Sequence, residues 1–182
     1  MGWIILIVIL VLLVIYLIST YNSFVRLRNS VREAFSTMDV YLKKRWDLIP
    51  NLVETVKGYA KHEKETLEGV IKLRNGAYES MSPEEKINAN QELSRGITKI
   101  MALAENYPEL KANTNFTDLS NQLARVEEDI ANSRKYYNAV VRKYNDKVEM
   151  FPSNLVASIF GFKLEKMFEI VEEERENVKV EF

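Results

Sequence analysis

Residues 116–150 read FTDLSNQLARVEEDIANSRKYYNAVVRKYNDKVEM and carry the strongest periodic pattern in the chain. Apolar side chains, with one exception, recur there at alternating intervals of four and three residues, which places them on one face of an α-helix. These positions are Leu119, Leu123, Val126, Ile130, Ser133, Tyr137, Val140 and Tyr144. All but Ser133 are apolar, so the face needs other helices to pack against, and the stretch predicts one member of a helical bundle.

Three other stretches, at 31–49, 53–71 and 93–104, also show helical spacing of apolar side chains. Pro50 ends or kinks a helix because it lacks an N–H. Nothing around it resembles a reversal loop, so we expect a kinked helix that continues to a stop at Asn75–Gly76. The run Ser82-Pro83-Glu84-Glu85 predicts the start of the next helix, with Ser82 as N-cap.

Tyr107–Pro108 is expected to end that helix, and residues 111–115 to form a loop. No alternating run is long enough for a core strand. The predicted fold is all-α: an N-terminal transmembrane helix continues into an antiparallel up-and-down helical bundle of the four-helix type, with long helices. A short C-terminal helix and an extended tail follow. We expect an anchor at 1–25, the bundle at 26–150 and a C-terminal apolar segment at 151–182.

The first 25 residues contain no charged side chain, although the chain has 25 Lys and Arg and 26 Asp and Glu. The unbroken apolar run includes Trp3, Ile4, Leu10, Tyr16 and Ile18. A helix needs roughly 20 such residues to cross a bilayer. A cleaved signal peptide is the alternative, but no basic side chain precedes the run and 19–21 is a poor cleavage site. The pattern favours an uncleaved membrane anchor.

Basic side chains dominate the stretch just after this run, at residues 26–45. They are Arg26, Arg28, Arg32, Lys43, Lys44 and Arg45, against Glu33 and Asp39. The positive-inside rule then predicts a single-pass protein of the cell membrane, with a short N-terminus outside and the C-terminal domain cytoplasmic. Lys43–Arg45 is either a headgroup contact or a solvated basic patch.

Composition excludes several classes of function. The chain has no cysteine and one histidine, so thiolate nucleophiles, Cys-based zinc sites and multi-histidine metal sites within one chain are excluded. A formal charge of −1 argues against a nucleic-acid partner. We nominate no catalytic, metal or cofactor-binding residue, and expect no cofactor. An enzymatic role would require carboxylates that converge in a pocket.

Two stretches share Tyr-Asn, Val-Arg and a second asparagine seven residues on. They place Asn22 with Asn29, and Asn138 with Asn145, on one helix face each. Buried asparagines at this spacing would fix the register between helices. The alternative is chance similarity with solvated side chains.

The C-terminal segment from Met150 to Val171 is rich in apolar residues. Leu164, Met167, Phe168 and Val171 are spaced as one face of a short helix. The segment either packs on the bundle or forms a docking or membrane-surface element. The candidate docking residues are Leu155, Ile159, Phe160, Phe162, Met167, Phe168 and Phe182. The ending 178–182 alternates with period two, which suits strand addition to a partner, or else a frayed or packed tail.

Several motifs are similar to those of the LemA family of bacterial membrane proteins. They are LKKRWDLIPNLVETVKGYAKHE at 42–63, YN at 21–22, YPELKAN at 107–113, YN at 137–138, FPSN at 151–154, GF at 161–162 and VKVEF at 178–182. This resemblance implies one N-terminal span and a cytosolic domain related to four-helix bundles, with no established catalytic residue or cofactor. Some members help to form membrane compartments such as magnetosomes, and family genes often neighbour membrane metallopeptidases.

From these features we expect a membrane-anchored helical scaffold or adaptor that does no chemistry of its own. It would act through self-association or membrane-protein partners at the bilayer. The alternative is an accessory or substrate-presenting factor for a membrane protease or chaperone, working through the apolar C-terminal segment.

Overall fold

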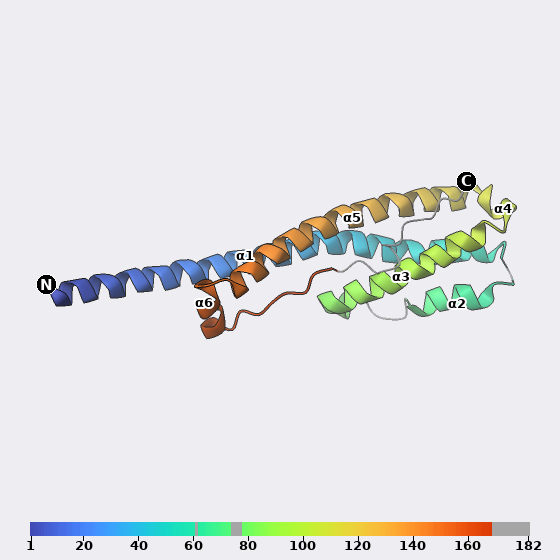
Figure 1. Ribbon diagram of the computed structural model, residues 1–182. Coiled ribbons are helices and arrows are strands. Elements are labelled where there is room, and N and C mark those ends of the chain that lie inside the picture. Colours follow the sequence, from blue (N-terminus) through green and yellow to red (C-terminus); the bar gives the residue numbers. More distant parts are fainter. Residues whose placement is uncertain (61, 74–77, 169–182) are drawn as a thin grey trace, which may run out of the picture. The chain divides into compact units, whose positions relative to one another are not determined.

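The computed structural model describes residues 1–60, 62–73 and 78–168 (Figure 1), and most of these residues are helical while none forms a strand. The helices are α1 (Gly2–Lys57), α2 (Lys64–Leu73), the 3-10 turn η1 (Tyr78–Ser80), α3 (Pro83–Ala104), α4 (Pro108–Lys111), α5 (Thr114–Glu149) and α6 (Ser153–Phe160). The all-α prediction is confirmed. The chain forms two compact units, residues 1–36 with 135–167 and residues 37–134 with 168–182.

The unit of residues 37–134 is an antiparallel bundle. The second part of α1, then α2, α3 and the first part of α5 alternate in direction along the unit (Figure 1). Their apolar faces meet in a core that excludes water. Its buried side chains include Met38, Leu42, Ile49, Leu52, Val56, Leu67, Val70, Leu93, Ile100, Leu123, Val126 and Ile130. The periodic stretches of the sequence therefore supply the core, as predicted.

The helix reversal between α1 and α2 does not lie where the sequence pattern suggested. α1 continues through Pro50, as predicted, but ends at Lys57, and α2 begins at Lys64. The prediction of one helix over 53–71 was wrong. Gly58 costs a helix about 1 kcal/mol relative to alanine, which favours a helix end there. The reversal also lets the apolar face of α2 pack against the second part of α1 in the core. The predicted stop at Asn75–Gly76 lies outside the described residues.

The predicted start of α3 is confirmed by its N-cap. The Ser82 hydroxyl accepts a hydrogen bond from the Glu85 N–H, and the Glu85 carboxylate accepts one from the Ser82 N–H. This reciprocal pair satisfies two backbone donors that the first turn leaves free. The loop expected at 111–115 is present but shorter, because α4 ends at Lys111 and α5 begins at Thr114.

In the unit of residues 1–36 and 135–167, α6 packs beside the first part of α1 and the last part of α5. Gly161 ends α6 in the left-handed conformation, at φ +70°, which glycine adopts without a steric penalty. The segment that follows, residues 162–168, is extended. The prediction of a helix with a face through Leu164, Met167 and Phe168 was therefore wrong, and Val171 lies outside the described residues.

Side chains of α5 explain why this segment is extended. Asn145 pairs with the backbone of Glu165 through two hydrogen bonds: its Nδ2 donates to the Glu165 carbonyl and its Oδ1 accepts from the Glu165 N–H, both at 2.9 Å. The Tyr137 hydroxyl donates to the Lys166 carbonyl, also at 2.9 Å. These bonds satisfy backbone groups that a helix would have satisfied internally.

Candidate functional site: the apolar helix beside the span

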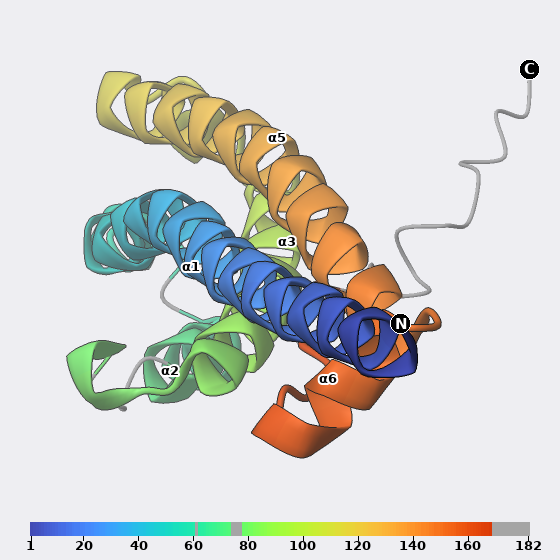
Figure 2. The same ribbon diagram turned by 90° about the vertical axis from the view of Figure 1, so that its left-hand side faces the viewer.

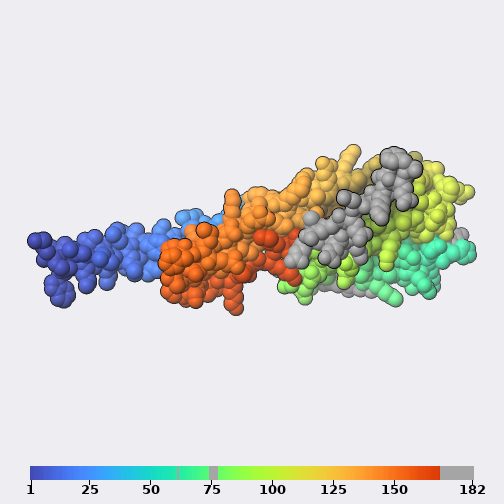
Figure 3. All heavy atoms as spheres, in the orientation of Figure 1, coloured from blue at the N-terminus to red at the C-terminus, as the bar shows by residue number. Residues whose placement is uncertain are grey.

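Residues 2–16 of α1 form an apolar helical stretch in which every residue is exposed. Its most apolar window has a mean hydropathy of 3.1, and none of that window is buried. The predicted span residues Trp3, Ile4, Leu10, Tyr16 and Ile18 are all exposed, and the dark-blue N-terminal end has no neighbouring segment on the face shown in Figure 3. This helix is long and apolar enough to cross a bilayer.

Aromatic side chains connect α1, α5 and α6 just after the apolar run. Phe162 stacks on Phe24 with the ring centroids 4.6 Å apart, and Phe160, the last residue of α6, lies 4.8 Å from Tyr21. Tyr144 of α5 meets Phe24 edge-on at 6.3 Å. Such pairs are worth about 0.5–1.5 kcal/mol each beyond the area they bury. They hold α6 at the level of Tyr21 along α1.

α6 also carries an exposed apolar surface. Leu155 and Ile159 are 55% and 71% exposed, and Phe160 stays 52% exposed beside Tyr21, whereas Val156 and Ala157 are buried. Exposed large apolar side chains are common singly, but several on one short helix mark an interaction surface. We call Leu155, Ile159, Phe160 and the exposed Phe151 that precedes α6 the α6 surface.

The remaining candidate docking residues lie elsewhere. Phe162 is buried in the aromatic cluster, and Phe168 is buried near Arg134, whose guanidinium carbon lies 5.5 Å from the ring centroid. Met167 is half-buried, and Phe182 lies outside the described residues. The structure therefore brings only the α6 part of the predicted docking set to one exposed surface among the described residues.

Basic side chains surround the aromatic cluster. The Arg28 guanidinium lies 5.3 Å from the Phe162 ring centroid, and the Lys147 ammonium lies 5.5 Å from that of Phe24 while donating to the Ser23 hydroxyl. Burial, and then repulsion from Arg26, lowers the pKa of Lys147. The first basic side chain of α1, Arg26, thus lies about two helical turns after Ile18, where the apolar run ends.

The four asparagines do not share one environment. Asn22 and Asn29 are exposed, whereas Asn138 and Asn145 are half-buried. Asn145 binds the backbone of Glu165, as described above, and so orders the segment after α6. That the four side chains set the register between helices stays a prediction.

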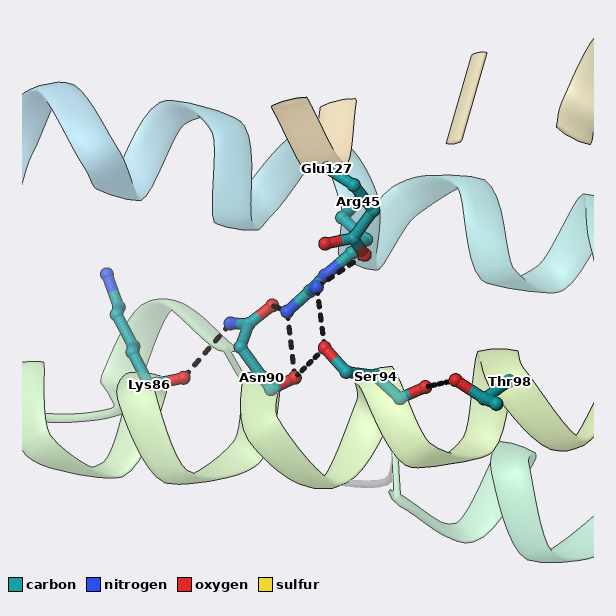
Figure 4. Close-up of polar contacts among 6 residues, drawn as sticks. All are labelled: Arg45, Lys86, Asn90, Ser94, Thr98 and Glu127. Carbon is teal, nitrogen blue, oxygen red and sulfur yellow. Dashed lines mark hydrogen bonds and ion pairs between the residues drawn. The ribbon is translucent and has the colours of Figure 1, made fainter. Parts of the chain in front are cut away.

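A buried arginine organises the bundle of residues 37–134 (Figure 4). Arg45 is 2% exposed, and its guanidinium reaches α3 and α5. Its Nη1 donates to the Ser94 hydroxyl at 2.8 Å and to the Glu127 carboxylate at 2.6 Å. Its Nη2 donates to the carbonyl and the side-chain oxygen of the buried Asn90, at 2.7 and 3.0 Å. Arg45 thereby connects three helices with charge-assisted hydrogen bonds.

Reasoning from the sequence missed this cluster because it treated Lys43–Arg45 as a surface patch. Arg45 is neither solvated nor a headgroup contact. One signal was available: the helical face through Met38, Leu42 and Ile49 lacks a member one turn after Leu42, and Arg45 lies at that position.

A half-buried polar group, Asp39, lies on the same part of α1. Asp39 accepts a hydrogen bond from the Tyr78 hydroxyl at 2.7 Å and forms an ion pair with Lys86 at 2.6 Å. Burial, and then the hydrogen bond with Asp39, raises the pKa of Tyr78. Lys86 also lies over the Tyr78 ring, 4.8 Å from its centroid. Each of these residues has its charge or hydroxyl satisfied by a neighbour, as in a structural network.

The part of the chain that the structure describes holds no group of three or more His, Asp or Glu suited to a metal ion. A groove of about 560 Å³ lies between α2 and α3 and is lined by Glu65, Glu92, Arg95 and Lys99, among others. At its floor, Gly96 allows the close approach of Val70, because a Cβ there would lie 3.0 Å from a Val70 methyl group.

The contact between Tyr137 and the extended segment predicts a loss of stability at alkaline pH. Burial, and then the charge of Glu165, raises the pKa of Tyr137 to about 12. The unfolded chain ionises this phenol at a lower pH, so the stabilisation is present below the unfolded pKa and is lost as pH rises through the folded pKa. Tyrosinate absorbance of the detergent-solubilised chain should show a late component, and Tyr137→Phe should remove one tyrosine's share of it, because the pKa values of Tyr78 and Tyr144 are raised as well. Tyr136→Phe, an exposed neighbour, should retain it; loss in both variants would contradict the assignment.

These features define an all-helical protein that combines a bundle with an N-terminal helix suited to one membrane crossing. Residues 34–182 match the sequence profile of the LemA family. The chain belongs to the LemA family.

Individual relatives cover most of the chain. It is 27% identical to a protein named LemA from Metamycoplasma hominis, over 86% of this chain and 72% of that protein. It is 27% identical to the magnetosome protein MamQ 2 of Paramagnetospirillum magneticum, over 90% and 71%, and 24% identical to the magnetosome protein MamQ of Magnetospirillum gryphiswaldense, over 87% and 68%. The family and the apolar helix indicate a membrane-associated protein.

Proposed function

We propose that the chain is a single-pass membrane scaffold or adaptor whose bundle binds a second copy or other membrane proteins on the cytoplasmic side. The observation that carries this proposal is that one helix, α1, contains both the apolar run and a wall of the bundle. A binding surface on the bundle is thereby tethered to the membrane by a continuous helix and not by a flexible linker.

Three further observations support the proposal. The basic side chains after the apolar run favour the cytoplasmic side for the bundle. The polar groups inside the bundle, at Arg45 and Asp39, are occupied by contacts that join helices. Such contacts support a rigid shape. Relatives named as magnetosome proteins are consistent with work at a membrane.

Photo-crosslinking in native membranes tests the proposal. A photoreactive amino acid is placed, one at a time, at the exposed positions Val40, Arg125 and Tyr136 of the full chain, and the adducts are identified by mass spectrometry. We expect adducts with a second copy or with membrane proteins. Recovery of the monomer alone from all three positions would contradict the scaffold role. A membrane protease or chaperone as the recurrent adduct would favour the accessory role instead.

Because the chain has no cysteine, the orientation can be measured separately. A single cysteine at the exposed Lys44 should resist a membrane-impermeant maleimide in intact cells and react after lysis. Reaction in intact cells would place the bundle outside.

A further inference from the structure

We propose that α6 is an interfacial membrane helix, whose α6 surface inserts into the boundary between headgroups and acyl chains of the leaflet from which α1 emerges. This inference rests on the proposed crossing of the membrane by α1. The ligand is the lipid of that same bilayer. The inference goes beyond the anchor, because it assigns a second, separate contact with the membrane.

The level of α6 along α1 is the first argument. The rise from Trp3 to Tyr21 is about 27 Å at 1.5 Å per residue, close to the roughly 30 Å thickness of a hydrocarbon core. With Trp3 at one boundary, Tyr21 therefore lies at the other, where tyrosine and tryptophan are preferred. Phe160 is in ring contact with Tyr21, at 4.8 Å. The end of α6 is thus held at the same boundary.

The direction of α6 is the second argument. In both views of the molecule, α6 lies across the direction of the first part of α1 and not along it (Figures 1 and 2). A helix that crosses the bilayer is tilted by only about 20° from the membrane normal on average. A helix that lies across it therefore runs close to the membrane plane, which is how interfacial helices lie.

The chemistry of α6 and its surroundings is the third argument. No charged side chain occurs from Met150 to Phe162, and the large side chains that this stretch exposes are apolar. Its other side, with Val156 and Ala157, packs on the protein. Arg28 and Lys147 lie at the aromatic cluster next to α6, where they would meet phosphate groups.

These observations favour lipid over a protein occupant. The α6 surface is held by its own chain at the depth where lipid already surrounds α1. A protein partner would have to displace that lipid. Interfacial helices bury their apolar face about 5–10 Å into the boundary between headgroups and acyl chains. Insertion to this depth would cover the α6 surface without a protein partner.

Depth-dependent fluorescence quenching tests the proposal on the full chain in vesicles of phosphatidylcholine and phosphatidylglycerol. Because the native chain has no cysteine, one environment-sensitive label is attached at Ile159→Cys or Leu155→Cys; both side chains are exposed, so the fold tolerates the change. We expect both labels to be quenched several-fold more strongly by lipids with a spin label near the headgroup than by lipids labelled near the chain end. Aqueous iodide should have little effect on either label.

Two matched labels separate the possible outcomes. A label at Lys135→Cys, an exposed position of α5 about 21 Å from Glu149 along the helix, should respond to iodide and not to lipid. A label at Leu10→Cys should respond to the chain-end spin label. If the chain-end spin label quenches the label at Leu10→Cys but iodide quenches the label at Ile159→Cys, then α1 crosses the membrane and α6 is not interfacial. If the chain-end spin label also leaves the Leu10→Cys label unquenched, then α1 does not cross the membrane. Shielding of Ile159 from iodide without lipid quenching would identify a protein occupant and overturn the proposal.

Discussion

Replacing Arg45 with methionine should lower the free energy of unfolding of the bundle by about 3 kcal/mol, the lower end of the range for breaking a buried ion pair. Methionine retains most of the aliphatic volume, so the loss reports the guanidinium and not a cavity. The buried side-chain oxygen of Asn90 would lose its hydrogen bond, at a cost of about 1–3 kcal/mol for a group left unsatisfied, whereas the Asn90 carbonyl keeps the bond from the Ser94 hydroxyl. Glu127 is 43% exposed and can return to water, which keeps the estimate at the lower end.

Chemical unfolding of the detergent-solubilised full chain, followed by circular dichroism, measures this effect. The matched control is Lys44→Met, which removes the same charge from the exposed neighbouring position and should change stability by less than about 0.5 kcal/mol. Equal unfolding midpoints for the two variants would mean that the Arg45 cluster does not stabilise the bundle.

Two arginines in the middle of the apolar run should move the chain out of the membrane. Leu10 and Leu13 lie near the centre of the stretch from Trp3 to Tyr21. On the insertion scale an arginine at the centre of a span costs about 2.5–3.5 kcal/mol, while each leucine contributes about −0.5 kcal/mol. The double variant Leu10→Arg/Leu13→Arg therefore weakens insertion by roughly 6–8 kcal/mol.

Fractionation followed by an alkaline carbonate wash measures this partition. The double variant should appear in the supernatant, and the control Leu10→Ala/Leu13→Ala in the membrane pellet. The carbonate wash removes surface-bound protein, so contact through α6 alone would not retain the variant. A double-arginine variant that stays in the washed pellet would show that the apolar run of α1 is not the anchor.

The features that were predictable from the sequence are those that local chemistry decides. The spacing of apolar side chains in residues 116–150 identifies α5, and Ser82 with Glu85 identifies the start of α3, because periodicity and capping act within one helix. The apolar run at the N-terminus likewise needs no tertiary information, since length and hydropathy alone suit it to a bilayer.

The candidate site was only partly predictable. The sequence predicted that Leu155, Ile159 and Phe160 belong to a docking surface. It predicted the same for Phe162 and Phe168, which the structure buries. The helical spacing of Leu164, Met167 and Phe168 suggested a helix, and the extended backbone there depends on Tyr137 and Asn145, which are distant in sequence. Local spacing cannot reveal a partner that belongs to another helix.

The sequence by itself determined that this chain is a bundle of helices preceded by an apolar helix of membrane-spanning length, because those properties follow from the order of apolar and polar side chains. The tertiary structure decided which charges are buried and which apolar side chains remain exposed. Arg45 is inside because α3 and α5 supply oxygens for its guanidinium. The α6 surface is exposed because α6 buries only Val156 and Ala157. Both outcomes depend on contacts between segments far apart in the chain, which only the folded arrangement brings together.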